Sequence, residues 1–335
     1  MRAEHLKLTT YFGERDRVGG RLLGEELLDL YARQAIELSV LLRGAEGFGG
    51  LRHMRTDRLL TLSEDSPVVS VAVGERERIE RLAEFVRAVQ PRGLVTLEPV
   101  RMLERGIAPS GDCKLTVYLG RRESARGGPP FVAVTELLHR HGLAGATVLL
   151  GVDGSRRGIR LRARFLAHNK AVPLMVVAVG PGERLAGVFG ALKTLLAAPF
   201  ATVEPVNICK RDGRLLARPE PGAWQQLSVH CSQAATVNGR SLSGEIVRAL
   251  LAEGGAGATS LRGIWGFHGS EHEPHGDRLL QLRRRVPVLT VALDEPQRIP
   301  RAFEIIDALT VNEGLVTAES IPDPTVHFRP ALPPA

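Results

Sequence analysis

One phrase occurs twice in this chain, and it restricts the possible folds more than any other feature. Residues 41–50 read LLRGAEGFGG and residues 260–269 read SLRGIWGFHG, so the frame Leu-Arg-Gly-x-x-Gly-Phe-x-Gly keeps six identities. A second phrase, GLVTLEPV at 93–100, returns as GLVTAESI at 314–321 and in a shorter form, ATVEPV, at 201–206. Self-similarity at regular spacing indicates that a whole folding unit was copied.

The spacing of the phrases predicts three copies. DSPVVSVAV (65–73), AVPLMVVAV (171–179) and RVPVLTVAL (285–293) align, and their prolines precede the threonine of the closing phrase by 29, 29 and 30 residues. The second copy has changed most, because its Gly-rich phrase reads LLGVDGSRRG. We place the copies at 1–103, 112–209 and 223–322, followed by a Pro-rich tail at 323–335.

Each copy has the same predicted order of elements: strand, helix, two strands, helix and strand. Apolar residues recur at helical spacing in the two helices of the first copy. They are Leu22, Leu23, Leu27 and Leu30 in one helix and Ile79, Leu82, Phe85 and Val89 in the other. The order βαββαβ predicts an α+β fold of three tandem ferredoxin-like domains, each with four antiparallel strands and both helices on one face.

The repeat resembles the PII-like proteins, specifically the uncharacterised family called domain of unknown function 190. The resemblance rests on YFGERDRVGGRLL (11–23), LLRGAEGFGG (41–50), LTLSEDSPVV (60–69) and GLVTLEPV (93–100). It implies an arrangement like a homotrimer, with ligand clefts between neighbouring units, so three copies on one chain would form an intramolecular pseudo-trimer. One departure is that the phosphate loop Gly-Asp-Gly-Lys of true PII proteins is replaced by the turns VQPRGLVT and VNEGLVT.

The Gly-rich phrases are the first candidate ligand site. Glycines let backbone N–H groups approach an anion closely, and arginines supply positive charge. The alternative is that the two phenylalanines are packing anchors. Since the second copy lacks the arginine and the phenylalanine, we expect unequal clefts. The candidate residues are Arg43, Gly44, Gly47, Phe48, Gly49 and Gly50 in the first copy and Arg262, Gly263, Gly266, Phe267 and Gly269 in the third.

The loop GERDRVGGR at 13–21 is a second candidate. Arg15, Arg17 and Arg21 precede a helix start, where free N–H groups and the helix dipole favour anions. The alternative is a solvated loop. Together, the two candidate sites predict a small anionic metabolite as ligand, for which an adenine nucleotide is one candidate.

A histidine-rich segment, HGSEHEPHGD at 268–277, is a third candidate. His268, His272 and His275 offer the donors that Zn, Ni and Cu favour, which gives an alternative function in divalent-metal binding or metal tolerance. Their spacing in a loop fixes no geometry, so we do not expect a metal as the main ligand.

Composition narrows the classes of function. The net charge of +7 comes from scattered arginines, without a dense basic stretch interleaved with aromatics, so nucleic acid is not expected as a partner. Cys113, Cys209 and Cys231 lack metal spacing and are expected to be buried free thiols of a reducing compartment. No apolar stretch of about 18 residues occurs, so we expect a cytoplasmic protein that is not inserted in a membrane.

No catalytic motif stands out, neither a nucleophile elbow nor a phosphate-binding Gly-Lys loop nor a paired His-Glu-x-x-His. The leading hypothesis is therefore a PII-like regulatory protein that is not an enzyme. It would bind a small anion at clefts between the copies and signal through the long loop after the second strand to a membrane transporter or an enzyme.

Overall fold

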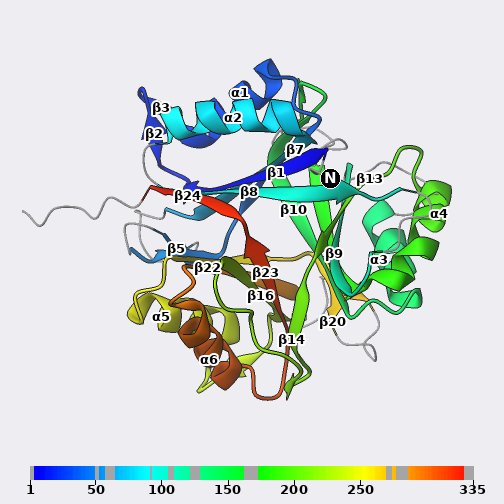
Figure 1. The fold of residues 1–335 in the computed structure, drawn as a ribbon, viewed down its shortest axis with the longest axis vertical. Coiled ribbons are helices and arrows are strands. Elements are labelled where there is room, and N and C mark those ends of the chain that lie inside the picture. The colour runs from blue at the N-terminus through cyan, green and yellow to red at the C-terminus, as the bar shows by residue number, and fades with distance from the viewer. Residues whose placement is uncertain are drawn as a thin grey trace, which may run out of the picture.

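The computed structural model has three pairs of helices on the outside and strands in the centre. In Figure 1 the pair α1 (Leu23–Arg33) and α2 (Arg76–Val89) lies at the top, and α3 (Pro130–Arg140) and α4 (Leu185–Leu195) lie at the right. The third pair, α5 (Leu242–Ala252) and α6 (Ile299–Leu309), lies at the lower left. The structure describes residues 4–49, 53–56, 65–90, 93–104, 109–120, 129–161, 173–268, 274–276 and 286–327.

Four long strands accompany each helix pair. The first copy has β1 (His5–Gly13), β4 (Leu38–Arg43), β7 (Pro67–Glu75) and β8 (Gly93–Met102). The second copy has β9 (Asp112–Gly120), β10 (Gly145–Arg156), β12 (Pro173–Pro181) and β13 (Phe200–Pro205), with a short 3₁₀ turn at Gly182–Arg184 before α4. The third copy has β16 (Trp224–Ser232), β19 (Gly257–Arg262), β22 (Pro287–Asp294) and β23 (Leu315–Ile321).

Short strands extend these sheets. Those after the second long strand are β5 (Glu46–Phe48), β6 (Arg55–Thr56), β11 (Ile159–Arg160), β20 (Trp265–His268) and β21 (His275–Gly276). Those after the last long strand are β14 (Asn207–Arg211), β15 (Arg214–Leu215) and β24 (Asp323–His327). Two small hairpins precede helices: β2 (Arg17–Val18) with β3 (Arg21–Leu22), and β17 (Thr236–Val237) with β18 (Arg240–Ser241).

Within each copy, the first long strand lies between the third and the fourth, and the second pairs with the third. All these pairs are antiparallel, as in β8-β1-β7-β4 of the first copy. The second copy has the order β13-β9-β12-β10, and the third has β23-β16-β22-β19.

The expectation of three separate ferredoxin-like α+β domains forming a pseudo-trimer is wrong, because the sheets do not end at the copies. β4 pairs with β10 and β8 pairs with β13, so the eight long strands of copies one and two form one closed antiparallel sheet. The third copy forms an eight-stranded sheet with β5, β6, β14 and β15. An open edge would leave its backbone N–H and C=O groups unpaired, and the neighbouring copies supply the missing partners.

The ends of the copies also cross over. The last residues of β8 pair with β13 of the second copy, β14 pairs with β23 of the third, and β24 pairs with β8 of the first. Each copy thus passes the end of its chain to the next, in a closed cycle. The start of the predicted Pro-rich tail, Asp323–His327, is therefore a strand.

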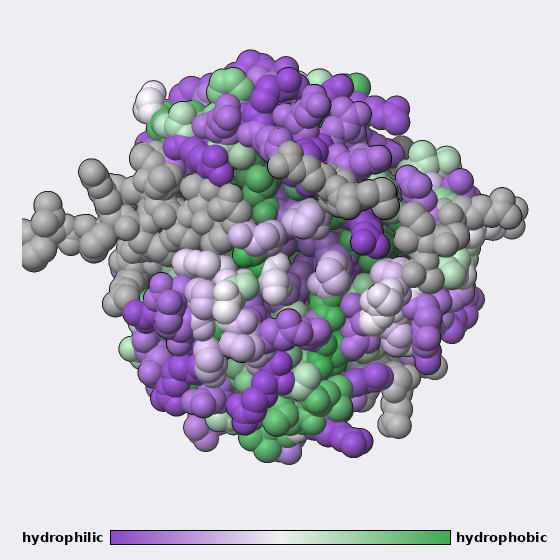
Figure 2. Space-filling model, viewed as in Figure 1, coloured by the Kyte–Doolittle hydropathy of each residue, from purple (hydrophilic) through white to green (hydrophobic). Residues whose placement is uncertain are grey.

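Apolar burial explains the two layers of each copy. Leu23, Leu27 and Leu30 of α1 face its sheet as predicted, whereas Leu22 precedes the helix and is exposed. In α2, Ile79 and Leu82 are buried and Val89 is partly buried as predicted, but Val86 is buried in place of Phe85, which is 47% exposed. A further cluster with side chains from all three copies fills the centre. Figure 2 shows that the outer surface over α1 and α2, at the top, is mainly hydrophilic.

Candidate functional site

The Gly-rich phrases carry the chain from one copy to another. Strand β5 belongs to the Gly-rich phrase of the first copy, but it pairs with β19 of the third copy. Strand β20 belongs to the phrase of the third copy, but it pairs with β10 of the second copy. In the second copy the far half of β10 pairs with β4 of the first. The phrases therefore lie at three boundaries between copies.

Two glycines of the phrase allow backbones to approach closely. A side chain at Gly47 would place its Cβ 2.7 Å from the carbonyl oxygen of Ala258. At Gly266, where φ is +153°, a Cβ would lie 2.1 Å from the carbonyl oxygen of Ala146. Neither gap admits a carbon atom, so the spacing of these glycines is explained by the strand crossing.

The first glycine of the phrase marks the point where the strand turns away from its own sheet. Gly44 donates its N–H to the carbonyl of Pro67 at 2.7 Å, and Gly263 donates to Pro287 at 2.8 Å. A Cβ added at Gly49 would meet no described atom within 4 Å, so that glycine is in open space. A contact of any of these glycines with a ligand stays a prediction.

The two phenylalanines are anchors in the core of another copy. Phe48 is 5% exposed among the apolar side chains of the third copy, and Phe267 is 1% exposed among those of the second. The Phe267 ring meets His139 edge-on, with centroids 4.9 Å apart. In the second copy Ser155 takes this position and shares a 2.8 Å hydrogen bond with Ser39. The packing alternative is thus what the structure shows for both rings.

The predicted arginines do not gather in one place. Arg43 forms an exposed ion pair with Glu14 at 2.8 Å, and the guanidinium of Arg17 donates to the carbonyl of Gly20 at 2.8 Å. Arg15 lies in the turn before β2, Arg17 lies in β2, and Arg21 lies in β3. Arg43 and Arg262 are the last residues of β4 and β19. Anion contacts of these residues stay predictions.

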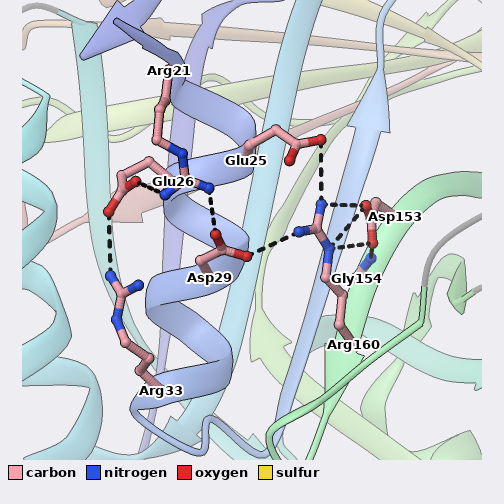
Figure 3. A network of polar contacts seen from close by, with 8 residues as sticks. All are labelled: Arg21, Glu25, Glu26, Asp29, Arg33, Asp153, Gly154 and Arg160. Atoms are coloured by element: carbon pink, nitrogen blue, oxygen red, sulfur yellow. Dashed lines mark hydrogen bonds and ion pairs between the residues drawn. The ribbon is translucent and has the colours of Figure 1, made fainter. Parts of the chain in front are cut away.

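A network of charges fills the boundary between copies two and one (Figure 3). Arg160 of β11 lies 2.8 Å from Asp153 and 2.9 Å from Asp29 of α1. Arg21, at 2.6 Å, contacts the other oxygen of Asp29, and this hydrogen bond holds the pKa of that carboxyl below its usual value. Both sides of the boundary are therefore already paired.

The boundary between copies one and three has similar groups but a more open arrangement. Glu46 of β5 takes the place that Asp153 has in the second copy, and it lies 3.8 Å from Arg248 of α5. Arg248 also pairs with Glu245, and Arg240 lies 3.5 Å from the same carboxylate. A cavity of about 480 Å³ lies beside them, lined by Gly239, Arg240, Ser241 and Arg248.

The boundary between copies three and two is apolar. Trp265 of β20 takes the place of Glu46 and Asp153 in the phrase, and it packs with Ile264 and Phe131 against the core of the second copy. The three boundaries thus differ in chemistry: one is closed by paired charges, one is apolar, and one borders a cavity with two arginines.

A second polar cluster lies where the three copies meet. It comprises three glutamates from the last long strands and, from the first long strands, two lysines and a glutamine at equivalent positions. Their side chains are at most 9% exposed. The cluster consists of Glu98, Glu204 and Glu319 with Lys7, Lys114 and Gln226.

The lysines bridge glutamates of different copies. Lys7 lies 2.9 Å from Glu98 of its own copy and also contacts Glu204 of the next. Lys114 lies 3.2 Å from Glu204 and also contacts Glu319 of the third copy. This ring of charges therefore ties the three copies together from the inside.

Burial and neighbouring charges set the ionisation of the ring. Burial alone would lower the pKa of Lys7, but Glu204 and Glu98 raise it well above its usual value. Burial would raise the pKa of Glu204, but Lys114 and Lys7 keep it low. For Glu319, burial outweighs the attraction of Lys114, and its pKa is raised. One carboxylate of the three is thus poorly compensated.

Sequence reasoning missed this ring, although its signal occurs three times. Thr-x-Glu is present in every copy of the closing phrase, as Thr96-x-Glu98, Thr202-x-Glu204 and Thr317-x-Glu319. A polar residue in a strand is ordinarily assigned to a solvent face. Retention of a glutamate through all three copies, while its neighbours change, is the feature that distinguishes it.

The histidine segment is only partly described. His268 lies in β20 with its Nε2 3.5 Å from Glu313, and for His275 the structure gives only the backbone pairing of β21. A metal site there stays a prediction. Three predicted site residues lie outside the described residues: Gly50, Gly269 and His272.

Three copies that exchange strands around a shared core define a chain built from one repeated family unit. The sequence matches the model of DUF190, domain of unknown function 190, described as an uncharacterised ACR family, at residues 5–102, 113–208 and 224–322. The chain belongs to this family, as its motifs indicated, in three tandem copies. It is similar to the UPF0166 protein of Aquifex aeolicus (strain VF5), with 29% identity over 104 residues, 31% of this chain and 98% of the relative.

Neither description states an activity. Across the residues that the structure describes, none of the helices combines the length and the apolar character needed to span a membrane.

Proposed function

We propose that this chain is a regulatory protein, not an enzyme, that binds a small anionic metabolite at the boundary between copies one and three. The observation that carries the proposal is the cavity of about 480 Å³ beside Arg240 and Arg248. Its volume is in the range of small-ligand pockets. It adjoins the Gly-rich phrase of the first copy through the contact between Arg248 and Glu46.

The charge of this cavity favours an anion. Two arginines line it, and the guanidinium group of arginine is best suited to paired hydrogen bonds with phosphate or carboxylate. Helix α5 starts at Leu242, and the side chain of Ser241 makes no capping hydrogen bond there. The N–H of Leu242 already donates to the carbonyl of Ala235 at 2.9 Å, so what the start of the helix adds is the attraction of its dipole for an anion.

A bound anion would act on the strand that crosses between the copies. It would compete with Glu46 and Glu245 for Arg248, and Glu46 belongs to β5, which is held on β19. Loss of that contact weakens the hold of β5 on the third copy. Strands β5 and β6, which pair with each other, would then present a different surface to a membrane transporter or an enzyme.

The three cysteines do not supply a catalytic nucleophile. All three cysteines are free and buried, as the sequence predicted. Burial raises the pKa of Cys113 and Cys231 to about 12 and that of Cys209 to about 11, so none is a thiolate nucleophile near neutral pH.

The test is a panel of adenine nucleotides, cyclic nucleotides and inorganic phosphate, scored by melting temperature and then by calorimetry. A ligand at 100 times its dissociation constant stabilises the folded state by about 2.7 kcal/mol. Arg248→Gln should weaken binding about tenfold or more, the equivalent of at least about 1.4 kcal/mol. Arg301→Gln, on the exposed face of α6 in the same copy, is the matched control and should bind as the unmodified chain does.

Two results would contradict the proposal: no anion of the panel changes the melting temperature, or Arg248→Gln binds the active ligand unchanged.

A further inference from the structure

The ring of charges at the centre lacks one bridge. Lys7 and Lys114 each join the glutamate of their own copy to that of the next. In the third copy the equivalent residue is Gln226, whose amide nitrogen donates to Glu319 at 3.3 Å. Within the described residues no cationic side chain joins Glu319 to Glu98, the pair that a third lysine would bridge.

The missing bridge leaves the ring short of one positive charge. When all three carboxylates are ionised, they and the two ammonium groups sum to a formal charge of −1, and all of these side chains are buried. An uncompensated charge in a protein interior is costly, because water no longer stabilises it. The polar neighbours do not supply the charge: Gln226 is neutral, and its amide oxygen accepts a 3.4 Å hydrogen bond from Tyr11.

A cavity leads to the glutamates from outside. It has a volume of about 320 Å³, and all three glutamates of the ring line it. Asp112 and Glu220 line it too, and none of its lining residues is basic. Such a passage attracts cations and repels anions.

The oxygens at the end of the cavity are placed for a small cation. One oxygen from each glutamate of the ring can be chosen so that all lie within 4.8 Å of one another. The Oε1 atom of Glu204 is buried and has no hydrogen-bond partner among the described residues, although its Oε2 contacts both lysines. A buried carboxylate oxygen with free lone pairs, on a residue that lines the cavity, is a ligand atom without a ligand.

We propose that this cavity binds one monovalent cation, held by Glu98, Glu204 and Glu319 near the position where a third lysine would place its ammonium group. The charge of the ring sets the charge of the ligand. A singly charged ion makes the ring neutral, whereas a divalent ion would leave an excess of +1 in the interior. An alkali ion and the ammonium group of a small amine share this chemistry, and the experiment separates them.

The experiment uses the full chain, dialysed into tetramethylammonium chloride at fixed ionic strength. Sodium, potassium, methylammonium, magnesium and calcium chlorides are then added in turn, with calorimetry and melting temperature as readouts. One monovalent cation per chain should bind and raise the melting temperature. Binding of methylammonium alone would identify an amine, and binding of sodium or potassium an alkali ion. The proposal would be overturned if a divalent ion bound more tightly than every monovalent ion. It would also be overturned if none of these cations bound.

Gln226→Lys tests the position directly. The new ammonium group should take the place of the ion, so that the variant binds no cation and its melting temperature no longer depends on the salt used. Cation binding by this variant at the affinity of the unmodified chain would refute the assignment.

Glu319→Gln is a second variant. It removes the negative charge of one of the three carboxylates and makes the ring neutral. Its affinity for the cation should fall at least about tenfold. Glu304→Gln on the exposed face of α6 is the control and should keep both affinity and stoichiometry. Unchanged affinity in Glu319→Gln would also overturn the proposal. The anion site does not enter either experiment, so the two proposals can fail separately.

Discussion

Removing the Phe267 ring should reveal how much the strand crossing contributes to stability. The ring belongs to the third copy but lies 1% exposed in the core of the second, against the edge of His139. Truncation of a fully buried phenylalanine loses its transfer free energy and leaves a cavity, which together cost about 3–5 kcal/mol. Since a protein is commonly stable by about 5–15 kcal/mol, Phe267→Ala should remove a large share of the free energy of unfolding.

The assay is urea unfolding followed by circular dichroism, with amide hydrogen exchange as a local readout. Exchange should accelerate in β20 and in the half of β10 that pairs with it, because the anchor that holds these strands together is gone. Phe85→Ala is the matched control, since that ring is 47% exposed on α2 and should cost about 0.5 kcal/mol or less. A loss below about 1 kcal/mol in Phe267→Ala would refute the anchoring role, because it would match a surface substitution.

Three shorter predictions concern the same framework. Gly47→Ala should lower the free energy of unfolding by about 1–3 kcal/mol in urea titrations, because the added Cβ would press on the Ala258 carbonyl. Gly49→Ala is the control and should change the free energy of unfolding little, because that position is in open space. Lys114→Met should lower the free energy of unfolding by about 3–5 kcal/mol at pH 7, because it leaves buried carboxylates unpaired. This loss should become smaller at acidic pH, where the carboxylates take up protons. An equal loss at all pH values would contradict the prediction. Burial, with the charges of His268 and Lys114, lowers the pKa of His230 to about 3. The unfolded chain therefore binds this proton first, and stability should fall as pH drops below about 6.5. His230→Tyr, the residue type of the other two copies, should remove that part of the loss in a series of unfolding titrations at different pH values.

The sequence predicts the helices and strands of each copy because buried residues recur along them at a regular spacing. The buried positions Leu23, Leu27 and Leu30 recur at helical spacing, and the strand phrases around Pro67, Pro173 and Pro287 align in all copies. The exchange of Phe85 for Val86 in α2 reflects the choice between the positions three and four residues after Leu82, both of which are apolar. Packing against a particular sheet decides between them, and that sheet is not visible in the pattern.

The crossings between copies could not be predicted in the same way. β5 has three residues and β20 has four, too few for an alternating pattern to appear. Their glycines and phenylalanines allow two interpretations, a loop for a ligand or a strand pressed on a neighbour. Only the position of the Ala258 and Ala146 carbonyls, in other copies, distinguishes the two. The closed sheet results from contacts between copies, so it cannot be predicted from the sequence of each copy alone.

Joining the three copies in one chain removes a constraint that identical subunits would impose. In an assembly of identical subunits, a substitution changes every equivalent position at once. Here the ring has lysine, lysine and glutamine, and a later position of the same strands has Tyr11, Tyr118 and His230. The boundary position likewise has Glu46, Asp153 and Trp265. One boundary could therefore be closed by ion pairs and another by apolar packing without loss of the cavity at the third. The same freedom lets the ring keep two fixed ammonium groups and leave one position for an exchangeable cation.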